Sequence, residues 1–157
     1  MWLIDDARNL EQCEIFFRDS QTIGSFNKLI FKSKTTHLSK YYGIFNDEKL
    51  VAYYWLMKFE KIPNTYKAHE IRVDPSYQKQ GIAAFFINHI LFREKKQILS
   101  DHFHSNAISL VWESFRRNAD LIVGTYDEIT NEIDWKGNFN KNQLYGNDHV
   151  HLIVKAK

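Results

Sequence analysis

Apolar and polar positions along this chain predict strands and helices in mixed order, beginning near the N-terminus. The apolar letters "MWLID" predict a short first strand. A helix is predicted from Ala7 to Arg18, because Cys13 and Phe17 fall on one apolar stripe at helical spacing. A second, shorter helix is expected from Ser25 to Lys32. The first quarter of the chain therefore predicts one strand followed by two helices.

The pattern of apolar and polar residues in the middle of the chain predicts a β-hairpin, then a strand and then a buried helix. The segments "KYYGIF" and "KLVAYYWLMKFE" are rich in strand formers, and the turn letters "NDE" separate them. The next segment, "KAHEIRV", is predicted as another strand. An apolar helix is predicted from just after Gly81 to about Lys96.

The second half continues the alternation. "QILSD" predicts a short strand, "SNAISLVWESFRRN" an amphipathic helix, and "ADLIVGTYDE" and "HVHLIVKAK" two late strands. The polar stretch 129–147 between those strands is left open as an extra short strand or a long loop, and its part from Trp135 to Tyr145 is a candidate lid. Strands and helices in this order indicate an α/β domain with a mixed sheet.

Composition narrows the class of protein without naming a function. A length of 157 residues predicts one domain, residues 1–157, with a core large enough to need no metal or disulfide. The net charge of +2 is too small to indicate a nucleic-acid binder by itself. One cysteine excludes an internal disulfide and suits a reducing compartment. No apolar stretch has spanning length and the N-terminus is unlike a secretion signal, so a cytoplasmic protein is expected.

The stretch "RVDPSYQKQGIAAFFINHIL", residues 72–91, joins a strand to a buried helix through a short polar loop. A helix start leaves amide N–H groups without intrahelical partners and carries partial positive charge. Gly81 has no Cβ and so allows a ligand to approach the backbone, Ala83 keeps the first turn open, and Lys79 adds charge. The segment therefore predicts a cradle for an anion, most often a phosphate.

This segment resembles the central motif of the GNAT superfamily of acyl-coenzyme A-dependent N-acyltransferases. The family's loop reads Arg or Gln, two residues, Gly, one residue, then Gly or Ala, and the letters "QKQGIA" at 78–83 fit it. The preceding "IRVDP" is similar to the family's fourth strand and turn, and the order of elements fits over most of the chain. The resemblance implies a GNAT-like mixed, mostly antiparallel central sheet flanked by helices, and an N-acetyltransferase acting on a primary amine.

The resemblance also implies where acetyl-CoA, the co-substrate, is held. Its pyrophosphate is expected on the backbone amides of the loop, and its pantetheine arm along the strand that precedes the loop. Asn106, at the head of the later helix, occupies a position where the family often places asparagine. The expected cofactor-binding residues are Ile71, Arg72, Val73, Gln78, Lys79, Gln80, Gly81, Ile82, Ala83 and Asn106.

Acyl transfer to an ammonium requires a group that takes a proton from the amine. His69 lies four residues before Val73, where some family members place a histidine base, and histidine titrates near neutral pH. The alternative, that His69 is a hydrogen-bonded core residue, stays open. Glu70 is the second candidate base, although Arg72 lies on the same face of the strand and favours an ion pair.

The family's proton donor to the leaving thiolate, a tyrosine seven residues after the asparagine, is missing. Counting from Asn106 leads to Glu113, with Trp112 as the nearest aromatic residue. Tyr126, Ser105 or solvent is left to supply that proton. The departure supports an alternative in which the chain is a catalytically weak GNAT-like binding or inhibitory protein.

Three further patterns are weighed against ordinary structural roles. The stretch from Ser20 to Asn46 has no acidic residue and contains Lys28, Lys32, Lys34 and Lys40, which favours either a solvated basic face or a modifier of nucleic acid or nucleotides. The His-x-His pairs at 102–104 and 149–151 lack further ligands at a recognisable spacing, so no metal is expected. Cys13 is expected in the core. No membrane partner is expected. A homodimer is possible.

Overall fold

The structure is a computed structural model that describes the backbone of residues 7–101, 106–135 and 149–157. Side chains are described for residues 12–101, 110–135 and 149–157. The predicted strand "MWLID" lies outside these ranges. The chain divides into two compact units, residues 1–58 with 69–89 and residues 59–68 with 90–157. No helix in the described ranges is long and apolar enough to cross a membrane.

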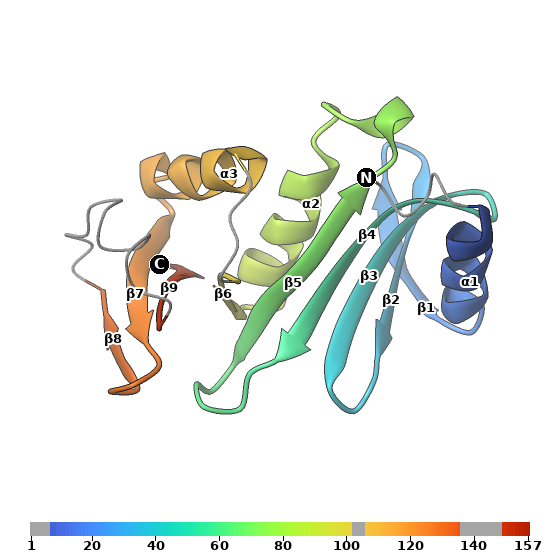
Figure 1. Cartoon of the computed structure of the whole chain (residues 1–157). Helices are drawn as coiled ribbons and strands as arrows, with labels where there is room; N and C mark the ends of the chain where they lie inside the picture. The colour runs from blue at the N-terminus through green and yellow to red at the C-terminus, as the bar shows by residue number, and fades with distance from the viewer. Residues whose placement is uncertain (1–6, 102–105, 136–148) are drawn as a thin grey trace. The chain divides into compact units, whose positions relative to one another are not determined.

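The first unit is an antiparallel sheet with a helix on each face (Figure 1). Its strands follow one another in chain order, and the second half of the next strand, β5, belongs to the same unit. The elements are α1 (Ala7–Phe17), β1 (Gln21–Phe26), β2 (Leu29–Thr35), β3 (Ser39–Asn46), β4 (Lys49–Lys58), β5 (Thr65–Val73) and α2 (Ile82–Asn88). The predicted first helix and the predicted hairpin are confirmed.

The second helix expected from Ser25 to Lys32 is wrong, because this stretch forms the hairpin of β1 and β2. Phe26 pairs with Leu29 across a two-residue turn. Asn27 and Lys28 both have positive φ, 46° and 68°, which is the backbone of a type I′ hairpin turn. The apolar letters on either side of the turn therefore pair across it instead of stacking along a helix.

Strand alternation gives the sheet of the first unit two different apolar faces. On one face, Phe17 of α1 packs with Phe45, Leu50 and Tyr53 in a buried cluster. On the other face, α2 places Phe86 against the rings of Phe31, Tyr42 and Tyr54, with centroid distances of 6.0, 6.4 and 6.1 Å. Tyr53 and Tyr54 are neighbours in sequence and therefore face opposite helices.

The predicted buried helix after Gly81 is present and ends three residues earlier than expected. A short 3₁₀ turn, η2 (Pro75–Tyr77), leads into the loop, and α2 begins directly after Gly81. The helix continues as a π-helical turn, η3 (His89–Arg93). Asp74 shapes the entry to this connection, because its carboxylate accepts a 2.8 Å hydrogen bond from the amide of Ser76.

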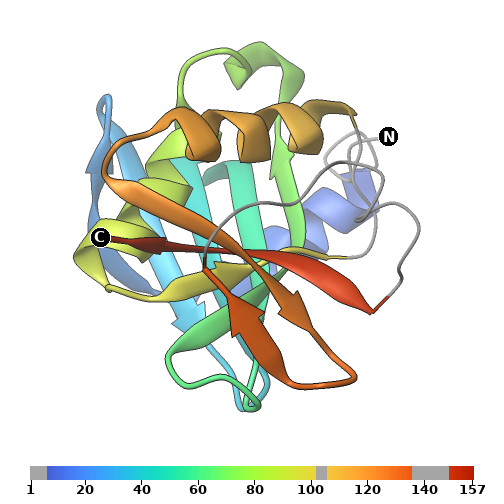
Figure 2. The same ribbon diagram turned by 90° about the vertical axis from the view of Figure 1, so that its left-hand side faces the viewer.

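The second unit is a smaller sheet around β9 (Figure 2). β9 lies antiparallel between β6 and β7, β8 pairs with the far edge of β7, and β6 pairs in parallel with β5 over Thr65–Lys67. The elements are β6 (Gln97–Leu99), α3 (Asn106–Arg117), β7 (Leu121–Asp127), β8 (Glu132–Asp134) and β9 (Val150–Ala156). The extra strand left open by the sequence is thus β8. The predicted α/β class with a mixed, mostly antiparallel sheet is confirmed.

Gly124 is the position in the second unit where a side chain has no room. A Cβ at Gly124 would lie 2.5 Å from the backbone oxygen of Asp134 and 2.9 Å from the ring of Trp135. We expect Gly124→Ala to destabilise the protein by about 2 kcal/mol or more, because backbone of β8 has to move. Thermal unfolding measures this as a lower Tm.

Gly24→Ala is the matched control, because a Cβ there meets only the ring of Phe31 at 3.8 Å, an ordinary contact. Equal Tm values for the two variants would contradict the close approach of β7 and β8.

Candidate functional site

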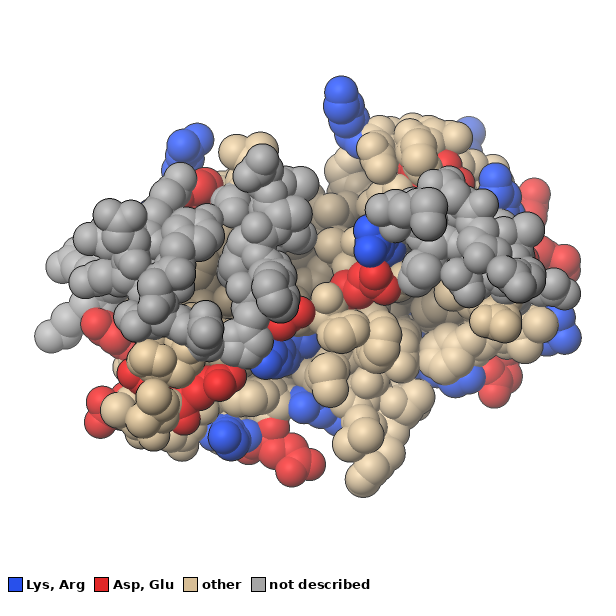
Figure 3. Space-filling model, in the orientation of Figure 1, with Lys and Arg blue, Asp and Glu red and all other residues tan. Residues whose placement is uncertain are grey.

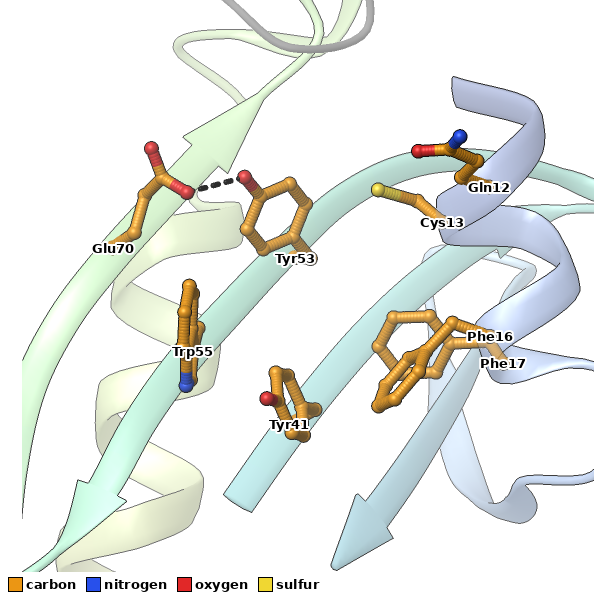
Figure 4. Close-up of a pocket in the computed structure, with 8 residues that line it drawn as sticks. All are labelled: Gln12, Cys13, Phe16, Phe17, Tyr41, Tyr53, Trp55 and Glu70. Carbon is orange, nitrogen blue, oxygen red and sulfur yellow. Dashed lines mark hydrogen bonds between the residues drawn. The ribbon is translucent and has the colours of Figure 1, made fainter. Parts of the chain in front are cut away.

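A cavity of about 270 Å³ opens in the first unit between α1 and the sheet (Figure 4). α1 contributes one wall, and β3, β4 and β5 contribute the floor and the opposite wall. Its lining residues are Gln12, Cys13, Phe16, Phe17, Tyr41, Tyr53, Trp55 and Glu70. The described lining of this cavity thus combines the carboxylate of Glu70 with mostly aromatic side chains.

Glu70 is held by a partner on each of its carboxylate oxygens. The hydroxyl of Tyr53 donates a 2.6 Å hydrogen bond to Oε2, and Arg72 lies 2.8 Å from Oε1. Burial, followed by the neighbouring Glu70, raises the pKa of Tyr53 far above its ordinary value, so this hydroxyl remains a donor. The ion pair with Arg72 that strand spacing favoured is confirmed. Figure 4 shows the Glu70 carboxylate turned toward Tyr53 at the end of the cavity opposite α1.

Aromatic rings form a continuous apolar surface across the rest of the cavity. Tyr41 and Trp55, on β3 and β4, stack with centroids 5.6 Å apart and an interplanar angle of 24°. Phe16 of α1 meets Tyr41 edge to face at 4.6 Å. Strand positions 53 and 55 share a face with position 41 of the paired strand, so alternation alone brings these rings together.

His69 is exposed and is not among the residues that line the cavity. Its ring packs against Trp55 with centroids 4.1 Å apart. The alternative of a core histidine is therefore wrong, because the side chain is on the surface. Its contact with Trp55 places it next to a residue that does line the cavity.

Cys13 lies in the cavity wall, half-buried, where the sequence predicted a core position. Burial raises the pKa of its thiol, and the negative charges of Glu70 and Glu14 raise it further. A raised pKa keeps the thiol protonated near neutral pH. The residue is thus no activated nucleophile.

The loop after β5 has the backbone of an open anion cradle. Gly81 has φ of +85° and caps α2 without a side-chain hydrogen bond, and Lys79 also has positive φ, 62°. A Cβ added at Gly81 would meet only the edge of the Phe26 ring, at 4.0 Å. Among the described contacts, none engages the amides of residues 79–83. The loop backbone is therefore open at Gly81, and the anion site on it stays a prediction.

The sequence model of the acetyltransferase (GNAT) family matches residues 4–110, about two thirds of the chain. The chain belongs to the GNAT family. No curated protein sequence matches it. The GNAT resemblance stated from the loop motif is confirmed by this match.

Solved structures of GNAT proteins are similar to this member at low sequence identity. A GNAT family acetyltransferase from Elizabethkingia anophelis with acetyl-CoA bound has a TM-score of 0.50 and 11% identity, over 84% of this chain and all of that chain. The ribosomal-protein-S18-alanine N-acetyltransferase from Escherichia coli has a TM-score of 0.44 and 14% identity, over 96% of this chain and 89% of that chain. A GNAT-family protein from Bacteroides thetaiotaomicron matches with a TM-score of 0.44 and 12% identity. The match covers 79% of this GNAT chain and 65% of the length of that protein.

Two predicted site residues of this GNAT member, Tyr126 and Asn106, belong to the second unit. Tyr126 is fully buried in the second unit with Leu99 and Ile153, and its hydroxyl donates a 2.6 Å hydrogen bond to Asn131. Asn106 begins α3, but its side chain lies outside the described residues, as does Ser105. A buried and already bonded hydroxyl is poorly suited to protonating a leaving group.

The histidine pairs give no ligand cluster in the part of the chain that is described. His149 lies 3.9 Å from Asp127, and the buried His151 lies 2.6 Å from Glu128, which identifies both as partners of carboxylates. Residues 102–104 of the other pair lie outside the described ranges. No group of three metal-ligating side chains occurs within those ranges.

The lysine-rich segment lies on β1, β2 and β3, and most of its ammonium groups have partners. Lys34 lies 2.9 Å from Asp19, Lys32 lies 4.9 Å above the ring of Phe45, and Lys40 donates to the hydroxyl of Thr35. On the face drawn in Figure 3, acidic and basic side chains are interspersed among the described residues. These contacts favour the solvated basic face over a nucleic-acid interface.

Sequence reasoning missed the cavity and the wall that α1 supplies to it. Gln12, Phe16 and Tyr41 were not singled out from the sequence. The available signal was the shared face of Tyr53, Trp55 and Glu70 on paired strands.

Proposed function

We propose that this chain is an N-acetyltransferase that moves an acetyl group from acetyl-CoA to a primary amine seated in the cavity beside Glu70. The observation that carries the proposal is a carboxylate exposed to a mostly apolar cavity, in a chain that belongs to the GNAT family. We also propose that residues 1–157 act as one N-acetyltransferase domain, since the family match extends into both units.

The loop at 78–83 fits the diphosphate of acetyl-CoA. The amides of Lys79 to Ala83 are unengaged in the described contacts, Gly81 leaves the approach open, and the Lys79 side chain adds positive charge. Gln78 steadies the start of the loop, because its side-chain amide donates 3.2 Å to the carbonyl of Val73. Gln80 and the buried Ile82 complete the turn into α2.

The strand before the loop is proposed to hold the pantetheine arm. β6 pairs with β5 only over Thr65–Lys67, whereas β5 continues to Val73. The backbone from Ile71 through Arg72 to Val73 thus lies beyond the stretch of β5 that pairs with β6. Its polar groups on that edge suit hydrogen bonds to amide groups of a ligand.

When bound, acetyl-CoA supplies a thioester carbonyl carbon that an amine nitrogen can attack. A carbon–nitrogen bond forms, the carbon–sulfur bond breaks, the amine loses one proton, and coenzyme A leaves as the thiol after taking up one proton. The products are the N-acetylated amine and coenzyme A.

Glu70 is proposed to orient the amine and accept its proton. Its carboxylate is fixed by Tyr53 and Arg72, and its side chain is 22% exposed, toward the cavity. Preorganised acceptors of this kind act without reorganisation cost at the moment of reaction. His69 remains the second candidate, next to Trp55 at the edge of the cavity and able to pass the proton to solvent.

No catalytic role is assigned here to Tyr126, because its hydroxyl is buried and bonded to Asn131. Solvent is proposed to protonate the leaving thiolate. Asn106 stays a prediction as a cofactor contact. A cytoplasmic location and a homodimer also stay predictions.

The proposal is tested by binding and turnover together. Calorimetry with acetyl-CoA should show binding, and a panel of primary amines should yield coenzyme A thiol and acetylated amine by mass spectrometry. Binding of acetyl-CoA without turnover of any amine would instead favour the catalytically weak binding protein. No binding of acetyl-CoA would overturn the proposed function altogether.

A further inference from the structure

Among its described lining residues, the cavity of the first unit combines one carboxylate, that of Glu70, with a wide surface of aromatic rings. Arg72, at 2.8 Å, already balances the charge of this carboxylate. A balanced carboxylate orients an amine but adds little to affinity. Affinity must therefore come mainly from the apolar body of the ligand.

The rings available for such a body are partly uncovered. Phe16, Tyr41 and Trp55 are each only half-buried, although their neighbours Phe17 and Tyr53 are buried. Figure 4 shows Trp55 and Tyr41 along the sheet and Phe16 facing them from α1. A cavity surface of partly uncovered ring faces and edges favours an aromatic guest over an aliphatic one.

Near the end of the cavity away from Glu70, the ammonium of Lys34 lies 4.2 Å from the centroid of the Phe16 ring and donates 2.8 Å to the Phe16 carbonyl. Asp19, at 2.9 Å, already balances its charge. Charge at this end therefore adds little to the choice of ligand, and the rings decide it. The aliphatic chains of diamines and polyamines lack a ring that can stack there, so these amines are disfavoured.

The size of the cavity sets the last constraint. Its volume of about 270 Å³ falls just below the ~300–1,000 Å³ typical of sites for drug-sized ligands. One ring system with a short alkyl arm fits that space better than a peptide.

We propose that the acceptor is an arylalkylamine, with its aromatic ring packed against the surface formed by Trp55, Tyr41 and Phe16 and its primary amine at Glu70. This inference rests on the proposed function for the transfer step, but the binding of the amine can be measured without acetyl-CoA.

Cys13 provides a direct reporter of occupancy, because it lines the cavity and is the one cysteine of the chain. Alkylation by iodoacetamide at about pH 9, where a thiol of raised pKa is partly ionised, is followed by mass spectrometry. We expect millimolar 2-phenylethylamine or tryptamine to slow labelling at least threefold. Propylamine, which lacks the ring, and spermidine should leave the rate unchanged.

Trp55→Leu removes the stacking surface while keeping an apolar strand residue. It should abolish protection by 2-phenylethylamine and raise the KM of that amine roughly tenfold or more. Tyr66→Leu is the matched control, a half-buried ring on β5 outside the cavity, and should leave both values unchanged. Circular dichroism checks that both variants are folded.

The outcomes separate this inference from the proposed function. Turnover of spermidine together with no protection of Cys13 by any arylalkylamine overturns the inference and leaves acetyl transfer intact. Protection by arylalkylamines without turnover of any amine overturns the proposed function and supports the ligand class. Protection by propylamine equal to that by 2-phenylethylamine also overturns the inference.

Discussion

Glu70→Gln should lower kcat for acetyl transfer by roughly 10²–10⁴-fold, the usual contribution of a general base. Glutamine has the shape of glutamate, and its oxygen can still accept the hydrogen bond from Tyr53 that the carboxylate accepts at 2.6 Å. It cannot accept a proton from the amine, and it leaves Arg72 without its ion pair. Steady-state kinetics with acetyl-CoA and a productive amine measure the change.

Glu132→Gln is the matched control, a carboxylate-to-amide change at an exposed position of β8 that is not among the residues lining the cavity. It should keep kcat within about twofold, and acetyl-CoA affinity should be unchanged in both variants. His69→Gln decides between the two candidate bases. A full loss with His69→Gln beside near-normal turnover with Glu70→Gln would assign the proton to His69 and contradict the role given to Glu70.

Gly81→Asp should weaken acetyl-CoA binding by roughly tenfold or more, because a carboxylate at the head of α2 repels a diphosphate. Asp is one of the few residues that tolerate positive φ, here +85°, so the loop backbone is kept. The Cβ meets nothing closer than the Phe26 ring at 4.0 Å. Calorimetry at low and moderate salt measures the dissociation constant, and salt should reduce the difference.

Gly81→Asn separates charge from shape, since Asn has nearly the same size as Asp and tolerates the same backbone. It should bind acetyl-CoA at least several-fold more tightly than the Asp variant. Equal weakening by Asn and Asp would point to steric exclusion. Equal and normal affinity for both would place the diphosphate somewhere other than this loop.

Local patterns predicted the elements whose partners are close in sequence. The hairpin of β3 and β4 and the loop before α2 follow from alternation, turn residues and the strand–loop–helix order. The pairing of Glu70 with Arg72 also follows, because alternate strand residues share a face.

The β1–β2 hairpin was not predicted, because its turn depends on positive φ angles at Asn27 and Lys28, and the letters "NK" do not indicate such angles. The cavity could not be predicted, since it depends on which sheet face α1 covers. That is a matter of long-range packing, and sequence period does not reveal it. The exposure of His69 could not be predicted either, because its position along the strand did not decide between the surface and the core.

β2 ties together the two places where reactants are proposed to sit. Through Phe31 it supports the rings of Phe85 and Phe86 on α2, directly behind the Gly81 loop. Through Lys34, with Nζ donating to the Phe16 carbonyl, it holds α1. A substitution that shifts this strand therefore disturbs both α1 and α2. Kinetic data from such a variant would not separate the binding of acetyl-CoA from the binding of the amine.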